Sequence, residues 1–362
     1  MTATQVIVVG AGPAGSSSAK ALKEEGIEVL VIEKEALPRH KTCSGILFGQ
    51  TQVLLEKYFG RLPPESVYCR PEIIKASDIK EWDSEKGFFD YVWELPKDGR
   101  EFPKSYHNIW RNKFDYWLLE QSGSEYLEGC SLRGFTVQGD KVDVEIARKE
   151  ESCWQSKETH KDRQAFTCSY LIGADGGNSR IRRLLDPSWS RDNPEFVVFQ
   201  AYYHFSNRGS LKEGHWYVFF EPEISDMLCA VHQKDDFFAL CVGGLKGRNL
   251  KDSMEDFKRF LSRNFKVVFE KEERVEGCVM RQGPPNLGSG RIILTGEAAG
   301  FMYLNGEGIS AAIDSGYRAG KAVAKAIKEG SNAIDIYREQ TVDLMNHVNL
   351  CLEKMHFFAV SL

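Results

Sequence analysis

VIVVGAGPAG, residues 6–15, decides the fold of the N-terminal part of this chain. The apolar, β-branched run before the glycines is typical of a buried parallel strand. Gly10, Gly12 and Gly15 then have the G-x-G-x-x-G spacing of a turn that binds a diphosphate. Gly12 has no side chain to block the phosphates, and the expected helix over residues 13–25 directs its free amides toward them.

A second apolar strand, residues 28–32, ends at an acidic residue. This residue, Glu33, stands where a carboxylate accepts hydrogen bonds from ribose hydroxyls in dinucleotide-binding folds. Lys34 beside it, and Pro13 and Ala14 between the glycines, are expected to contact the same ligand. The first βαβ unit therefore predicts a site for an adenosine diphosphate moiety.

Two later segments also run from an apolar strand through glycines into a helix. They are LIGADGGNSRIRR, residues 171–183, and RIILTGEAAGFMYLNGEGISAAIDSG, residues 291–316. In the middle segment Asp175 is suited to accept from a ribose or ribityl hydroxyl, and Asn178 is the expected N-cap of a short basic helix whose arginines are suited to neutralise phosphate. Three such turns in this order favour a resident flavin dinucleotide over a transient nicotinamide.

Composition and charge agree with a large enzyme. The 362 residues exceed one comfortable core, so two domains are expected. The formal charge of −5 and the lack of a basic run make nucleic acid an unsuitable partner. No apolar run reaches transmembrane length and no secretory signal precedes the first strand, which predicts a cytoplasmic protein without an integral span. Phe357 and Phe358 are the one candidate for peripheral membrane contact. The nine scattered cysteines favour neither disulfides nor a zinc site, so no metal is expected.

The rest of the chain is expected to interleave two domains. Helical patterns occur at residues 51–58, after Arg111 and at 251–264, whereas residues 132–171 alternate like an antiparallel meander whose hairpin tip is 149–164. Residues 195–244 indicate an antiparallel sheet. The expected division is a discontinuous cofactor-binding domain (1–70, 100–185 and 275–330), a substrate domain (71–99 and 186–274) and a C-terminal helical tail (331–362).

These motifs together resemble the superfamily of flavoprotein monooxygenases and geranylgeranyl reductases. The resemblance covers roughly residues 1–330 and rests on matching positions in the order Gly10, Gly12, Gly15, Glu33, Arg111, Phe114, Asp115, Gly173, Asp175, Gly176 and the segment Gly296–Gly308. It implies an α/β fold in which a doubly wound, Rossmann-like FAD domain is interleaved with an antiparallel or mixed-sheet substrate domain. PRHKTCSG, residues 38–45, resembles the reductase branch, which carries a Cys-x-Gly loop near the flavin.

The resemblance also implies which residues hold FAD. Arg111 and Asp175 are expected to contact the cofactor, and Gly306 to Gly308 to lie beside the isoalloxazine. A helix that starts near Glu307 would direct its first amides at the N1 and C2 carbonyl edge of the ring, where negative charge appears on reduction. The expected cofactor-binding residues of the second and third segments are Gly173, Asp175, Gly176, Gly296, Glu297, Ala298, Gly306, Glu307, Gly308 and Ile309.

Three positions depart from the superfamily pattern. Glu297 replaces the usual aspartate, so a cofactor hydroxyl must accommodate one more methylene. The usual proline is absent from residues 302–305. The Phe-Pro-Lys element of many prenyl reductases is missing from the expected sheet, where residues 226–238, DMLCAVHQKDDFF, stand instead.

Two chemistries fit the same FAD shell. In the first, reduced flavin delivers hydride to an alkene carbon of a small hydrophobic, prenyl-like substrate, and a nearby acid protonates its neighbour. In the second, NAD(P)H or another reductant reduces the flavin, which then activates oxygen to hydroxylate an aromatic or other hydrophobic substrate. Cys43 is the catalytic candidate for the first, because a small thiol packs near the flavin without blocking it.

Other functions fit the residues less well. Halogenases carry a Trp-x-Trp-x-x-Pro element, and the sequence has none. His40, His107 and His232 are isolated, which is more typical of packed or solvated side chains than of catalysts. A flavin-carrying sensor without turnover is the non-enzymatic alternative. Both enzymatic alternatives need an external electron donor.

Overall fold

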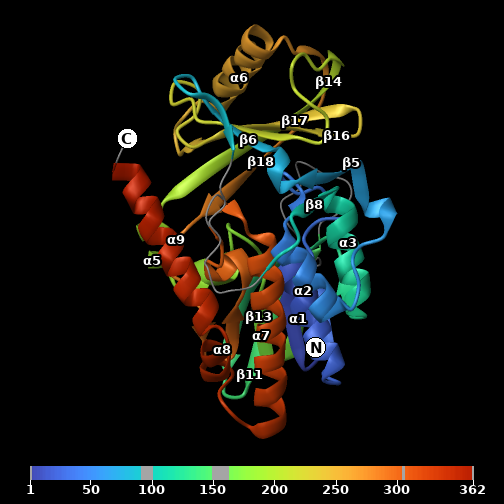
Figure 1. The fold of residues 1–362 in the computed structure, drawn as a ribbon. Coiled ribbons are helices and arrows are strands. Elements are labelled where there is room, and N and C mark those ends of the chain that lie inside the picture. The colour runs from blue at the N-terminus through green and yellow to red at the C-terminus, as the bar shows by residue number, and fades with distance from the viewer. Residues whose placement is uncertain (1, 91–100, 149–162, 304–305, 361–362) are drawn as a thin grey trace.

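The structure, a computed structural model, describes residues 2–90, 101–148, 163–303 and 306–360. In Figure 1 a lower part holds a parallel sheet between helices, and an upper part holds a long-stranded sheet covered by one helix. The α/β fold with C-terminal helices is confirmed. The predicted domain boundaries remain a prediction, and the predicted hairpin tip lies largely outside the described residues.

The six-stranded sheet brings the strands of the three glycine segments side by side. Its order is β19-β20-β13-β2-β3-β9, and every pair is parallel except β19 with β20. The strands are β2 (Val6–Val9), β3 (Val29–Ile32), β9 (Glu125–Leu127), β13 (Tyr170–Gly173), β19 (Gly288–Ser289) and β20 (Ile292–Leu294). Val9 pairs with Gly173, which pairs with Leu294, so all three strands end at one edge of the sheet.

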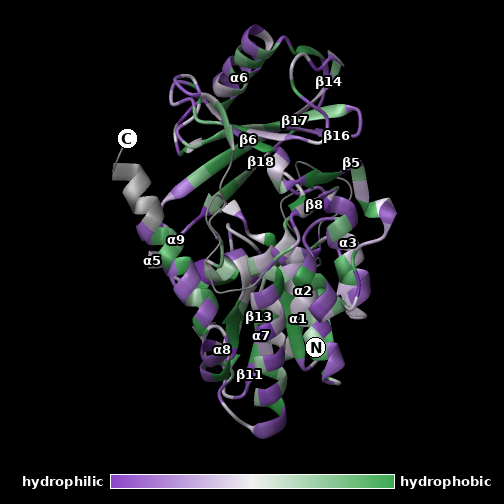
Figure 2. Ribbon diagram, in the orientation of Figure 1, coloured by the Kyte–Doolittle hydropathy of each residue, from purple (hydrophilic) through white to green (hydrophobic). Residues whose placement is uncertain are grey.

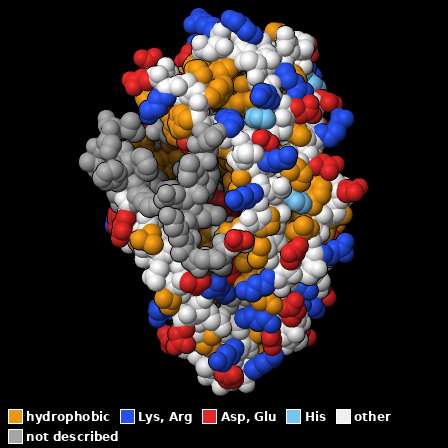
Figure 3. Space-filling model, in the orientation of Figure 1, with side chains coloured by type: hydrophobic (Ala, Val, Ile, Leu, Met, Phe, Trp, Pro, Cys, Tyr) orange, Lys and Arg blue, Asp and Glu red, His pale blue; other side chains and the backbone are white. Residues whose placement is uncertain are grey.

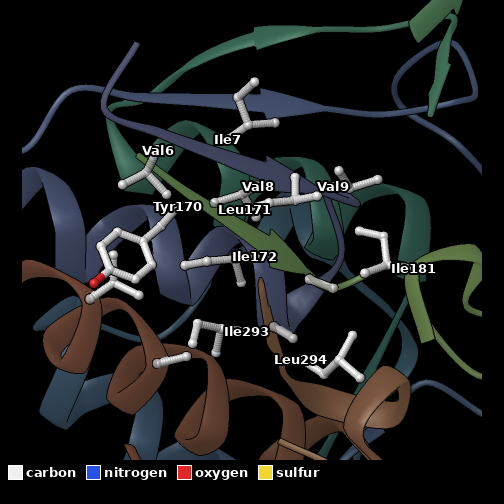
Figure 4. Close-up of a cluster of buried hydrophobic side chains, with 14 of the residues drawn as sticks. Val6, Ile7, Val8, Val9, Tyr170, Leu171, Ile172, Ile181, Ile293 and Leu294 are labelled. Carbon is white, nitrogen blue, oxygen red and sulfur yellow. The ribbon is translucent and has the colours of Figure 1, made fainter. Parts of the chain in front are cut away.

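Apolar side chains from these strands form the largest core. Figure 4 shows β2, β13 and β20 contributing Val8, Ile172 and Ile293 to one cluster, with Ile181 beside them. These four side chains are fully buried, which is why the strands read as continuous apolar runs rather than as alternating ones. In Figure 2 the strands behind α1 and α7 are correspondingly hydrophobic.

Helices flank this sheet, and two of them pack unusually closely. The helices are α1 (Pro13–Glu24), α2 (Gly49–Phe59), α3 (Arg111–Ser122), α4 (Arg180–Leu185), α5 (Pro187–Asp192), α7 (Ile309–Glu329), α8 (Ala333–Gln340) and α9 (Val342–Val360). A Cβ on Gly316 of α7 would lie 2.3 Å from the carbonyl oxygen of Ala14 in α1. Gly316 thus permits α7 to pack closely against the first turn of α1.

A four-stranded sheet confirms the predicted meander. Its order is β1-β12-β11-β10. The pairs β10–β11 and β11–β12 are antiparallel, and β1 is parallel to β12. The strands are β1 (Thr2–Ala3), β10 (Cys130–Gln138), β11 (Lys141–Arg148) and β12 (Arg163–Cys168). This sheet packs its buried face, including Val142 and Val144, onto the core of the parallel sheet.

The seven-stranded sheet forms the upper part. Its order is β18-β14-β17-β16-β15-β6-β7, and it is antiparallel except where β15 pairs with β6. The strands are β6 (Ile79–Asp83), β7 (Gly87–Asp90), β14 (Glu195–Asn207), β15 (Trp216–Phe219), β16 (Cys229–Lys234), β17 (Phe237–Leu245) and β18 (Val268–Arg281). Helix α6 (Leu250–Phe265) covers its outer face through Phe257 and Leu261. It confirms the helix predicted at residues 251–264.

The inner face of the seven-stranded sheet meets the lower part across a small third layer. This layer is a three-stranded sheet of β4 (Ile46–Leu47), β8 (Ser105–Ile109) and β5 (Tyr68–Lys75). Ile79 of β6 packs there against Ile46 and Ile74. On the face of the molecule shown in Figure 3, basic and acidic side chains are intermingled. No helix in the described part of the chain is long and apolar enough to cross a membrane.

Candidate cofactor and substrate site

The first glycine turn has the geometry of a diphosphate cradle. Helix α1 begins after Gly12, no side chain caps its first amides, and no acidic residue stands in its first turn. Gly10 has a φ of 108°, and a Cβ there would lie 2.4 Å from the carbonyl oxygen of Ala174. A Cβ on Gly15 would lie 1.8 Å from the carbonyl oxygen of Gly10. Neither glycine tolerates a side chain, and the helix start remains open to an anion.

Glu33 is buried at the centre of a charge network beside this turn. Its Oε2 accepts from the Ala11 amide at 3.0 Å and lies 3.0 Å from Nε of Arg39. Arg39 also binds Asp115 at 3.1 Å, and the Asp115 carboxylate in turn accepts two hydrogen bonds from Arg111. The network fixes the guanidinium of Arg111 at the start of α3.

The residues predicted from the sequence to bind the cofactor included Lys34 but not Arg39. Arg39 approaches the cradle, since its Nη2 would lie 3.4 Å from a Cβ on Gly12. Its position in a proline-containing loop gave no periodic signal. Lys34 is exposed and takes part in none of these contacts.

The middle segment places a carboxylate at the end of β13. Oδ2 of Asp175 accepts from the amides of Arg180 and Ile181, at 2.7 and 3.3 Å, and Oδ1 is buried without a partner among the described residues. Burial raises the pKa of Asp175. The prediction of Asn178 as N-cap is wrong, because Ser179 accepts from the Arg182 amide instead. Gly176 next to Asp175 has a φ of 76°.

Arg182 supports the backbone rather than facing outward. It is fully buried and donates to the carbonyl oxygens of Glu297, Ala298 and Gly177. It therefore ties the middle segment to the third segment. The sequence had marked it only as a possible counter-charge for phosphate.

The third segment completes the convergence of the glycine turns. A Cβ on Gly296 would lie 2.7 Å from Cβ of Ala14, and a Cβ on Gly177 would lie 2.3 Å from Oε1 of Glu297. This Oε1 is buried and has no hydrogen-bond partner in the described part of the chain. Because Gly10 also meets Ala174, each of the three segments touches the other two.

The start of α7 holds the last predicted residues. Gly308 is the N-cap of α7, Ile309 is its first residue, and Gly306 has a φ of 76°. The carboxylate of Glu307 accepts from the amide of Ser310 at 3.0 Å and from its hydroxyl. The helix start expected to face the flavin is therefore capped in part by the chain itself.

These residues fit an FAD molecule. The open start of α1 and the bare backbone at Gly12 suit a diphosphate, and the partnerless oxygens of Asp175 and Glu297 suit ribityl or ribose hydroxyls. Arg39 and Arg111 lie on the same side, where Glu33 and Asp115 balance their charges. The donor and acceptor set thus agrees with a dinucleotide that spans the three turns.

The Cys43 loop joins this site to the seven-stranded sheet. Gln200 of β14 donates from Nε2 to the Cys43 carbonyl at 3.2 Å, and His232 of β16 lies 3.0 Å from the Ser44 carbonyl. Because a carbonyl oxygen only accepts, His232 carries its proton on Nε2. The Gly45 amide lies 3.3 Å from the Cys43 sulfur. The loop is therefore held between the two parts of the molecule.

A polar cavity of about 10 Å³, enough for one water molecule, lies beside Cys43. Tyr202 is buried there and donates to Glu276 at 2.9 Å. Lys234 is buried too; it donates to the Ile109 carbonyl at 2.6 Å and to Asn108 at 3.1 Å, and burial lowers its pKa. The residues that line the cavity are His40, Lys41, Cys43, Ile109, Trp110, Arg111, Asn112, Tyr202, Lys234, Arg274 and Glu276.

The parallel sheet with its three converging glycine turns defines a dinucleotide-binding flavoprotein. The sequence profile of the FAD binding domain family matches residues 3–57 and 119–348, so the chain belongs to this family. It is an FAD-dependent oxidoreductase. The predicted recognition and the FAD cofactor are confirmed at that level.

Relatives agree with this assignment over most of the chain. An uncharacterized protein of Methanosarcina barkeri is 25% identical over 349 residues, which are 90% of this chain and 76% of the relative. Protein CbrA of Escherichia coli O157:H7 is 28% identical over 325 residues, 86% of this chain and 81% of CbrA.

Solved structures share the fold. A geranylgeranyl bacteriochlorophyll reductase-like protein from Thermoplasma acidophilum superposes with a TM-score of 0.76 at 16% identity, over 96% of this chain and 85% of that protein. Aklavinone-11 hydroxylase, in a complex with FAD and aklavinone, gives a TM-score of 0.71 at 20% identity over 96% of this chain and 68% of the hydroxylase. The two structures carry different chemistries on one architecture, so the reaction must be argued from the site.

Proposed function

We propose that this oxidoreductase saturates a carbon–carbon double bond of a hydrophobic, prenyl-like substrate. The observation that carries the proposal is the position of the Cys43 loop, whose Cys43 and Ser44 carbonyls are bound by Gln200 and His232 of the seven-stranded sheet. These contacts hold the Cys-x-Gly turn against the inner face of that sheet, which supports a place for the turn between the proposed cofactor and the substrate. When bound, FAD supplies the hydride.

The inner face of the sheet offers small side chains next to this loop. Ala230 of β16 pairs with Cys241 of β17, and Cys241 pairs in turn with Gln200 of β14. Ala239 of β17 pairs with His232 of β16. Ala230 and Ala239 are buried, so a flat or chain-like apolar substrate would reach them only when the residues that cover this face move aside. The Cys43 thiol stands at the flavin end of that face, where it packs against the substrate and helps to exclude water.

The test compares the oxidised enzyme, the reduced enzyme and two cysteine variants. Photoreduced enzyme is mixed without oxygen with a polyprenyl substrate, and reoxidation of the flavin is followed by absorbance. Cys43→Ala should slow reoxidation about tenfold or more and leave the flavin content unchanged, whereas the buried Cys130→Ala of the meander sheet should react normally. A product that carries oxygen from labelled O₂, with no anaerobic reoxidation, would reject alkene reduction.

Hydroxylation is the second candidate, and the polar cavity beside Cys43 favours it. A substrate hydroxyl placed there would meet the Tyr202 hydroxyl, which is already hydrogen-bonded to the Glu276 carboxylate. Such a pair can accept a proton from a phenolic substrate before oxygen transfer. Reduced nicotinamide is the proposed electron donor in this case, and cytoplasmic location is proposed for either reaction.

A further inference from the structure

Glu307 places a carboxylate at the helix start that faces the proposed flavin. The residue directly precedes Gly308, the N-cap of α7, and its carboxylate accepts from the amide and the hydroxyl of Ser310. The first turn of α7 contains no other acidic residue. No lysine, arginine or histidine of the described residues forms an ion pair with Glu307, so its charge is balanced only by Ser310 and the positive end of the helix.

The same positive end is where negative charge appears when the ring is reduced. Gly306 and Gly308 flank Glu307. If the flavin binds beside these glycines, its pyrimidine edge would share one helix terminus with the Glu307 carboxylate. Two like charges at one site cannot both be stabilised by the same few amides. A proton on one of them relieves the repulsion, and burial already raises the pKa of Glu307.

We propose that Glu307 takes up a proton when the bound flavin is reduced, which makes this residue a proton-coupled element of the cofactor site. A bound flavin would receive two electrons and one proton, and the Glu307 carboxylate would take up a second proton from solvent and become the carboxylic acid. The electrons come from a hydride donor such as reduced nicotinamide. The proposal rests on the proposed placement of the flavin beside Gly306–Gly308.

The neighbouring groups leave this role to Glu307. The Tyr303 amide donates to the Glu307 carbonyl at 2.8 Å, and burial together with Glu307 holds the pKa of the Tyr303 hydroxyl well above its ordinary value. On the far side of Tyr303, the His347 ring of α9 packs edge-on at 4.4 Å. Asp314 and Arg318, further along α7, are paired with each other. Met280 of β18, which approaches Gly306, does not titrate.

The proposal is tested by the midpoint potential of the flavin as a function of pH. For a two-electron couple a tenfold change in equilibrium constant is about 30 mV, so one proton gives about 30 mV per pH unit and two protons about 59 mV. In the FAD-loaded protein, titrated through mediators at an electrode, the wild type should show the steeper slope across the neutral range. Glu307→Gln should show the shallower slope. The proton on N5 is common to both proteins. A second proton on the pyrimidine edge of the ring instead of on Glu307 would change the slope in the same way, so a protonated-carboxyl band must also appear in the infrared difference spectrum of reduced minus oxidised wild type.

The matched control is Glu329→Gln, at the exposed far end of the same helix, which should keep the wild-type slope. Equal slopes in wild type and Glu307→Gln would overturn the proposal. If Glu307→Gln binds no flavin, the infrared difference spectrum of reduced minus oxidised wild type decides instead. A protonated-carboxyl band that appears on reduction supports the proposal, and its absence overturns it. A wild type that binds no FAD would refute the proposed function itself, which is a separate outcome.

Discussion

The parallel sheet and the seven-stranded sheet build the site in different ways. In the parallel sheet, each functional turn directly follows the strand that positions it, as Gly10 follows β2 and Ala174 follows β13. In the seven-stranded sheet, Gln200 and His232 come together only through the pairing of β14, β17 and β16. The glycine turns are therefore formed by residues that are contiguous in sequence, whereas the arrangement of Gln200 and His232 depends on strand register.

This difference predicts different sensitivities. Substitutions in the glycine turns meet rigid backbone, so they should act on folding and on cofactor binding at once. Substitutions on the inner face of the long sheet meet side chains and an adaptable loop, so they should act on pH dependence or on turnover. Four experiments can break or sharpen this contrast.

Gly15→Ala should have the largest effect. The new Cβ would lie 1.8 Å from the Gly10 carbonyl oxygen, and neither backbone segment can withdraw without separating α1 from β2. We expect no folded protein with bound FAD, measured as flavin absorbance per protein and as the thermal unfolding transition. Gly134→Ala is the control, because nothing lies within 4 Å of its Cβ position. A Gly15→Ala protein with full flavin content would refute the rigidity of the first turn.

Asp115→Asn should come second. The Asp115 carboxylate is almost fully buried and binds both Arg39 and Arg111, so the neutral amide leaves two buried guanidinium groups undercompensated. Removing one partner of a buried ion pair costs about 3–5 kcal/mol of unfolding free energy. Urea denaturation measures this loss, and weaker FAD binding should accompany it. Asp236→Asn removes the exposed pair with Arg70 and should cost about 1 kcal/mol or less; equal losses in the two variants would contradict the prediction.

The sequence predicted the strands and turns of the parallel sheet well because their signals are local. The first strand, its glycines and the helix that ends at Glu24 were all readable from spacing, and so were the strands that carry Asp175 and Gly296. The positions of Arg39 and Lys234 could not be predicted from the sequence. Arg39 lies in a loop without periodicity, and Lys234 becomes buried only when β16 packs beneath residues 43–45.

The accommodation of Glu297 was also beyond the sequence. Glu297 has one more methylene than the aspartate of the superfamily pattern, and the sequence alone shows no second change that makes room for it. Its counterpart, the missing Cβ of Gly177, lies in another segment and is recognised only from their 2.3 Å approach. Gly177 and Glu297 meet only in the folded structure, so the spacing of residues along the chain does not reveal such a pair.

His232→Gln should change the pH dependence of stability. Burial and the neighbouring Lys234 lower the pKa of His232 from 6.5 to about 3, so the folded protein keeps it neutral while the unfolded chain protonates. Between these values the unfolded state binds more protons, and the free energy of unfolding falls by about 1.4 kcal/mol for each pH unit of acidification. Urea denaturation from neutral to mildly acidic pH should show that this part of the slope disappears in the variant. His204→Gln, at a more exposed position of β14, should retain the slope; a wild-type slope in His232→Gln would show that His232 is not the group responsible.

The smallest expected effect tests whether the two departures in the cofactor site compensate each other. Gly177→Ala would place a Cβ 2.3 Å from Oε1 of Glu297, which is the end of a flexible side chain and can move aside, and 3.0 Å from the backbone carbonyl oxygen of Val279, a tight contact that remains. We expect about a tenfold weaker FAD affinity, equivalent to about 1.4 kcal/mol, measured by fluorescence titration of the apoprotein. Glu297→Asp withdraws the carboxylate by one methylene, so the double variant should recover most of the loss, with a coupling energy of about 0.5–3 kcal/mol. Strictly additive losses would mean that Gly177 serves only the backbone turn, and the contrast between rigid turns and adaptable side chains would then extend to this position as well.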